Sequence, residues 1–162
     1  MFKFLRRLLI ALSILLVLAQ LYPKDKKNNS SAVSVNDIGT KYTVPDNIQA
    51  ILKSSCYDCH SNNTAYPWYS KVQPIAWWLG GHIAEGKKNL NFSEFTIYSL
   101  KKQFRKLKEI QEQIEEDEMP LSSYTFIHRY ANLTGNQKKL LLNWVSATQD
   151  SMKTRNPAAS LL

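Results

Sequence analysis

Five consecutive residues of this chain combine side chains that could attach and ligate a metal cofactor: Cys56-Tyr57-Asp58-Cys59-His60. Two thiols three positions apart can each form a thioether bond to a haem vinyl group, and the imidazole that follows can then ligate the iron. The spacing therefore predicts one covalently bound haem c. Cys56 and Cys59 would hold it, and His60 would be the proximal iron ligand.

Two other uses of the cysteine pair have to be compared with haem attachment. Cys56 and Cys59 are the only cysteines in the 162 residues. A redox dithiol or disulfide of the thioredoxin kind would follow a strand, and no strand pattern precedes Cys56. A structural zinc site would need a second pair of ligands at a defined spacing, which the three histidines do not provide. Both alternatives stay open, and haem attachment is favoured.

The other face of the iron needs a ligand of its own, for which the chain offers three side chains. Met119, followed by Pro120, is the preferred distal ligand, because a thioether opposite histidine raises the reduction potential of a cytochrome c. His82 is the second choice. His128 and an open iron site are the remaining alternatives. A lone methionine is also a common filler of hydrophobic cores.

The first 22 residues have the composition of an export signal. Lys3, Arg6 and Arg7 precede a mostly apolar run from Leu8 to Leu21. Without an Ala-x-Ala cleavage site, the favoured interpretation is an uncleaved anchor helix in the inner membrane, with the domain in the periplasm. The alternative is signal cleavage and release into the periplasm. The net charge of +8 falls to +5 when Lys3, Arg6 and Arg7 are set aside, which fits proximity to an anionic bilayer or an acidic partner, and no basic-aromatic motif indicates nucleic acid.

Hydrophobic periodicity predicts an all-α domain behind this segment. We expect a flexible tether over 23–44, the haem-binding domain over 45–149 and a loose tail over 150–162. Apolar residues at helical spacing predict helices that begin near Pro45, Pro74, Ser93 and Thr134, with a loop over 121–133. The first of these helices would deliver Cys56. The Gly80-Gly81 pair predicts a close approach by another backbone or by haem, and Tyr66-Pro67-Trp68-Tyr69 predicts rings packed in a core or on haem.

The order of these features resembles a class I cytochrome c, in which a helix leads into Cys-x-x-Cys-His and a Met-Pro precedes the closing helix. More specifically, residues 36–149 resemble the haem-binding domain family of exported bacterial proteins. The residues that carry this resemblance follow the cysteine motif: Ser61-Asn62-x-Thr64-x-Tyr66-Pro67-Trp68-Tyr69, Pro74, Trp77, His82, Gly86, Asn91-Phe92-Ser93, Met119-Pro120, Tyr124 and His128. The resemblance implies a cytochrome c-like helical domain around a covalent haem.

Together these observations predict an exported, membrane-tethered monohaem c-type cytochrome that transfers electrons to a redox partner and is not an enzyme. No nucleophile or catalytic base constellation appears in the sequence. A haem-based sensor or a peroxidase-like protein with an open distal site is the alternative, and a structural module without redox function is a third.

Overall fold

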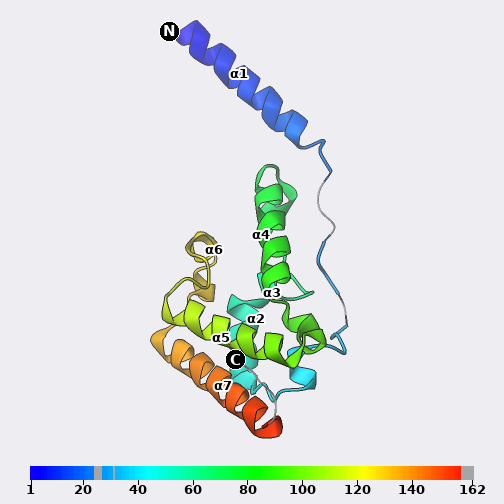
Figure 1. The fold of residues 1–162 in the computed structure, drawn as a ribbon. Coiled ribbons are helices and arrows are strands. Elements are labelled where there is room, and N and C mark those ends of the chain that lie inside the picture. The colour runs from blue at the N-terminus through cyan, green and yellow to red at the C-terminus, as the bar shows by residue number, and fades with distance from the viewer. Residues whose placement is uncertain (24–26, 31, 158–162) are drawn as a thin grey trace.

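The computed structural model describes residues 1–23, 27–30 and 32–157, and every regular element in this part of the chain is helical (Figure 1). The predicted all-α fold is therefore confirmed. The α-helices are α1 Phe2–Ala19, α2 Asp46–Ser55, α3 Tyr57–His60, α4 Ile75–Asn89, α5 Leu100–Glu115, α6 Ser122–Ile127 and α7 Gly135–Arg155. The 3-10 helices are η1 Ile38–Thr40, η2 Trp68–Lys71, η3 Phe92–Ile97 and η4 Arg129–Ala131.

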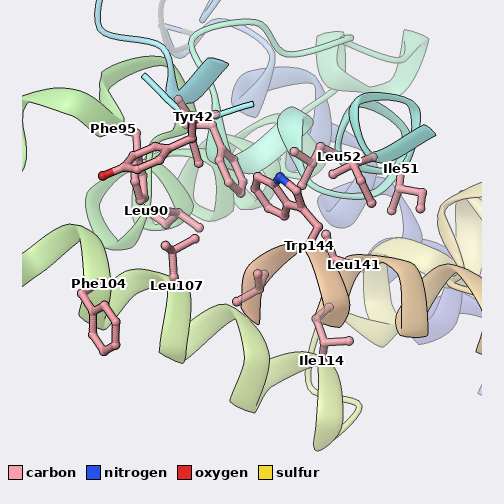
Figure 2. Packing of buried hydrophobic residues seen from close by; sticks show 14 of the residues in the cluster. Tyr42, Ile51, Leu52, Leu90, Phe95, Phe104, Leu107, Ile114, Leu141 and Trp144 are labelled. Atoms are coloured by element: carbon pink, nitrogen blue, oxygen red, sulfur yellow. The ribbon is translucent and has the colours of Figure 1, made fainter. Parts of the chain in front are cut away.

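The main hydrophobic core lies where α2, α5 and α7 meet (Figure 2). Leu107 from α5 and Leu141 and Val145 from α7 are fully buried there. The indole Nε1–H of Trp144 donates to the carbonyl of Thr43 at 3.0 Å, so its polar group is satisfied inside the core. The apolar faces predicted for α5 and α7 thus form the core that packs behind the cysteine motif.

Helix α5 begins later than the sequence predicts. Its N-cap is Ser99, whose hydroxyl accepts from the Lys102 amide at 3.4 Å, and Ser93 lies in η3. The expected first apolar position, Ile97, is exposed. Helix α5 ends at Glu115, and two residues later Asp117 has a φ of 60°, in the left-handed region that is common after helix ends.

The segment predicted as a flexible tether is attached to the domain at several points of its described part. Ile38 is completely buried, and Tyr42 is 6% exposed and donates its hydroxyl to Gln103 Oε1 at 2.6 Å. Upstream, the Asn28 amide N–H donates to the Tyr66 hydroxyl at 2.7 Å. The expectation is corrected because scattered apolar residues, each separated by polar neighbours, still reach the core. Residues 24–26 and 31 of the predicted tether lie outside the described part.

The C-terminal part also differs from expectation. Helix α7 continues to Arg155, and Met152 is buried in the main core, so the predicted tail at 150 is instead helix. Its end over 158–162 lies outside the described residues. The loop expected over 121–133 contains α6 and η4. Thr134 caps α7 through a capping box with Gln137, as the pattern at this position indicates.

The N-terminal helix forms as predicted and buries none of its residues. It spans 18 residues and includes Lys3, Arg6 and Arg7. Within the described residues, none of the helices has the combined length and apolar character that crossing a membrane requires.

Candidate functional site

The cysteine motif borders a cavity of about 560 Å³, within the range of roughly 300–1,000 Å³ that is usual for small-molecule and cofactor sites. Helices α2, α3, α4 and α5 and the segment after α5 contribute to its wall. Much of the wall is apolar: Leu52, Leu90, Phe92, Ile110, Ile114 and Leu141. Cys56, Cys59, His60, His82 and Met119 all line the same cavity. The structure thus brings five predicted site residues together.

Both cysteines are free thiols. Cys56 lies at the junction where α2 ends and α3 begins, which places it beside Cys59 on the short α3. Burial raises the pKa of Cys56 to about 12 and the pKa of Cys59 to about 11. A redox dithiol needs a thiolate near neutral pH, so this environment disfavours the dithiol alternative.

A zinc site also finds no support in the structure. In the part of the chain that the structure describes, His, Cys, Asp and Glu side chains do not gather in groups of three or more that could hold a metal ion. A closed structural zinc site needs four such ligands. The two thiols therefore lack the partners that zinc would require.

The imidazole of His60 is held in one tautomer by two backbone carbonyls. Its Nδ1 lies 2.9 Å from the Gly86 carbonyl oxygen and 3.1 Å from that of Leu90. Carbonyl oxygens only accept, so Nδ1 must carry the proton, which leaves Nε2 of the neutral ring with a free lone pair. Burial lowers the pKa of His60 and favours this neutral ring. A histidine that ligates a metal characteristically makes such a second hydrogen bond.

Gly86 is required for this arrangement, and sequence reasoning assigned it no role. A Cβ at Gly86 would lie 2.6 Å from the Cys59 carbonyl oxygen and 3.0 Å from Cys59 Cβ, closer than a side chain can approach. A close approach by another backbone, of the kind expected at Gly80-Gly81, occurs at Gly86. A Cβ at Gly81 would meet nothing within 4 Å. The only sequence signal for Gly86 was its place among the family-like positions.

The two preferred distal ligands share the cavity wall. Met119 is half-buried and packs against the main core, and its backbone N–H donates to the Gln113 carbonyl at 3.2 Å. His82 is half-buried on α4, with its ring edge-on to Trp78 at a centroid distance of 4.5 Å. The structure brings both side chains to the site, and either could face a metal held by His60.

His128, the third candidate, lies outside the cavity lining. Its Nε2 is 2.5 Å from the Tyr69 hydroxyl and its Nδ1 is 2.9 Å from the Tyr130 hydroxyl. Its ring also stacks on Tyr124, with centroids 4.4 Å apart. Because both ring nitrogens are hydrogen-bonded to tyrosines, the structure lends no support to His128 as an iron ligand.

Asp58, between the two cysteines, connects the motif to α6. The Tyr124 hydroxyl donates to Asp58 Oδ2 at 2.6 Å, and the Ala65 amide donates to Oδ1 at 2.8 Å. Burial and this hydrogen bond raise the pKa of Tyr124. Asp58 and Tyr124 both border the cavity, so the pair holds α6, which follows Met119 by a few residues, to the motif. Sequence reasoning missed this contact because the two residues are 66 positions apart.

The polar residues after the motif have a structural role. The Asn62 amide group donates to Glu94 and accepts from Asn91, at 3.0 and 2.9 Å, and the Asn62 backbone N–H donates to Ser93 at 3.1 Å. These contacts hold η3 beside α3. The aromatic residues Tyr66, Trp68 and Tyr69 are not among those that line the cavity. Tyr69 is buried in a second hydrophobic cluster and Tyr66 packs against it, which agrees with the alternative of rings in a core.

The side chains present fit a covalently held haem. Two free thiols, one imidazole of defined tautomer and one thioether surround a largely apolar cavity, and Lys106, ion-paired with Glu109, adds a cation at its border. Thioether and imidazole are established iron ligands in haem proteins.

Comparison with known proteins agrees with this chemistry. A family described as "haem-binding domain" matches residues 14–147. No curated protein and no solved structure shows significant similarity to the chain.

Proposed function

This chain belongs to the haem-binding domain family, and we propose that it carries one covalent haem c and transfers electrons. Cys56 and Cys59 would form the thioether bonds, His60 would be the proximal ligand and Met119 the distal ligand. When bound, haem iron supplies one-electron chemistry between its ferrous and ferric states.

The single observation that carries this proposal is the hydrogen bonding of His60. Two carbonyls fix its proton on Nδ1, so Nε2 is ready to ligate without a change of tautomer. The same cavity wall contains both thiols and the Met119 thioether. A ligand set of one histidine and one methionine has no open position for a substrate, which favours electron transfer over an enzyme or a sensor.

Export from the cytoplasm is the second part of the proposal. The basic residues Lys3, Arg6 and Arg7 followed by an apolar helix support an export signal. Haem attachment through thioether bonds is compatible with the oxidising conditions outside the cytoplasm, where free thiol pairs would otherwise form disulfides. We expect the domain to act in the periplasm.

Covalent attachment can be tested directly. The chain, expressed with a cytochrome maturation system, should keep its colour through acid-acetone extraction, and the double variant Cys56→Ala, Cys59→Ala should lose it. If the wild-type polypeptide binds haem but releases it in acid-acetone, the protein is a haem-binding domain without thioether bonds. That result would reject haem c while leaving the family intact.

The distal ligand decides between the electron carrier and the alternative of a sensor or peroxidase-like protein. Met119→Ala should remove the weak near-red absorption band of methionine-ligated ferric haem and let carbon monoxide bind the ferrous protein quickly. His82→Ala is the matched control and should keep the band. If His82→Ala alone changes the spin state, His82 is the ligand. Rapid carbon monoxide binding by the wild type would instead support an open site.

A further inference from the structure

Six large aromatic or apolar side chains are exposed on two segments of the domain, residues 68–78 and 126–130. We call this group the aromatic face and define it by six residues: Trp68, Trp77, Trp78, Phe126, Ile127 and Tyr130. Trp68 and Phe126 are each 78% exposed, and the other four are at least 40% exposed. Exposed groups of large apolar side chains on soluble domains commonly mark interaction surfaces.

The two sequence segments that form this face are joined through a contact between η2 and His128. The Tyr69 hydroxyl is 2.5 Å from His128 Nε2, and the Trp68 ring lies edge-on to Tyr69 at 5.9 Å. His128 in turn contacts Tyr130, and Phe126 and Ile127 directly precede it in α6. The segment that contains Trp68 is therefore in contact with the segment that contains Phe126, Ile127 and Tyr130.

The apolar N-terminal helix is attached to the same surface. The Gln20 side-chain amide donates to the Gln73 carbonyl and accepts from the Gln73 N–H, both at 3.0 Å. Tyr22 packs edge-on against Trp77 with ring centroids 5.1 Å apart. Helix α1, which buries none of its residues, thus leaves the domain next to the aromatic face. Two exposed apolar surfaces thus meet at one hydrogen-bonded junction.

The charge of the aromatic face also bears on which surface it can contact. Residues 65–82 and 121–134 contain no aspartate or glutamate, while Lys71 and Arg129 lie within them. Such a surface is not repelled by anionic lipid headgroups. Tryptophan and tyrosine are enriched at the boundary between headgroups and acyl chains, where an apolar ring and a polar N–H or O–H are both accommodated.

We propose that the aromatic face docks the domain onto the headgroup boundary of a lipid bilayer, beside α1. This goes beyond haem binding and does not depend on it. In this arrangement the N-terminal end of α4, at Ile75, contacts the bilayer. Gly86, which positions His60, lies about 17 Å further along the helix, at a rise of 1.5 Å per residue. The candidate haem site would then be held at a defined height, where a membrane-bound partner could reach it.

The test uses the full chain and protein-free vesicles of phosphatidylcholine with phosphatidylglycerol. Hydroxyl-radical footprinting, read by mass spectrometry, reports which side chains the bilayer covers. We expect vesicles to protect Trp68, Phe126 and Tyr130 from oxidation, and to leave Ile97, an exposed apolar residue of η3, as reactive as before. The protection should persist at high salt, because apolar contacts are not screened.

A pair of variants measures the contribution of the face separately from that of α1. Trp68→Ser combined with Phe126→Ser should weaken partitioning into vesicles by about tenfold, since two large side chains lose their apolar contact with lipid. Ile97→Ser, the matched control, should change partitioning by less than about twofold. Circular dichroism of each variant confirms that the helices are retained.

Two outcomes would overturn the proposal. In the first, vesicles protect α1 while Trp68 and Phe126 stay as reactive as in solution, which would mean that only the N-terminal helix binds lipid. In the second, the face is unprotected by vesicles but protected in native membranes. The occupant would then be a membrane protein and not the bilayer.

Discussion

Replacing Gly86 by alanine tests whether the packing of α4 against the cysteine motif positions His60. The added Cβ would lie 2.6 Å from the Cys59 carbonyl oxygen, and ordinary contact begins near 3.4 Å, so the two helices must separate by roughly 0.8 Å. Both contacting atoms belong to backbone or Cβ and cannot rotate away. The same separation lengthens the 2.9 Å hydrogen bond from His60 Nδ1 to the Gly86 carbonyl.

The size of the effect follows from two opposing contributions. Overpacking of this kind costs about 1–3 kcal/mol, whereas exchanging glycine for alanine inside a helix gains about 1 kcal/mol. We therefore expect Gly86→Ala to lower the free energy of unfolding by up to about 2 kcal/mol. The matched control is Gly81→Ala in the same helix, where a Cβ meets nothing within 4 Å. It should raise the free energy of unfolding by about 0.5–1 kcal/mol.

Urea unfolding followed by circular dichroism measures both variants, and absorption spectroscopy of the haem-loaded protein reports the iron ligands. Gly86→Ala should in addition weaken ligation by His60, while Gly81→Ala should leave the spectrum unchanged. The reasoning fails if Gly86→Ala is as stable as Gly81→Ala, because the close approach to Cys59 would then be absent in solution.

Three further predictions concern other contacts. Tyr124→Phe removes the hydroxyl that donates to Asp58, so it should lower the free energy of unfolding by about 1.5–3 kcal/mol and speed carbon monoxide binding. An unchanged midpoint of urea unfolding would contradict the contact. Burial lowers the pKa of His60, so below about pH 6.5 the unfolded imidazole binds a proton that the folded ring resists. The free energy of unfolding of the haem-free chain should therefore fall as the pH falls through this range. Urea unfolding at pH 5 and 7 should show a smaller loss for His60→Gln. Met152→Ala should cost about 2–5 kcal/mol in thermal or urea unfolding, whereas a loose tail would tolerate it.

The haem motif could be predicted from sequence because its chemistry depends on local spacing. Thiols at positions i and i+3 with the next residue a histidine are close together in any helical turn, and the structure places all three on one cavity. The apolar faces of α5 and α7 were predictable for a similar reason, since helical periodicity is a local property. Met119 and His82, the predicted distal ligands, both line this cavity, and which of them ligates iron stays a prediction.

The contacts that orient these groups could not be predicted. The acceptors for His60 are backbone carbonyls of Gly86 and Leu90, and every residue has a carbonyl, so no residue type marks them. The start of α5 was wrong because Ser93 and Glu94 look like helix-capping residues, but their side chains bond to Asn62 instead. Tertiary contacts outweighed the local preference at that point.

The two sides of the cavity are held with different stiffness, which bears on how the site can work. His60 is fixed by two carbonyls of α4, and α4 contacts α3 so closely at Gly86 that no side chain fits between them. Met119 lies on a connecting segment between α5 and α6, where the Asp58–Tyr124 hydrogen bond is the side-chain link back to the motif. The His60 side is therefore pre-organised for one ligand geometry. The Met119 side depends on contacts made by a connecting segment, among them the Asp58–Tyr124 hydrogen bond, so we expect changes in ligation to begin there and to leave His60 in place.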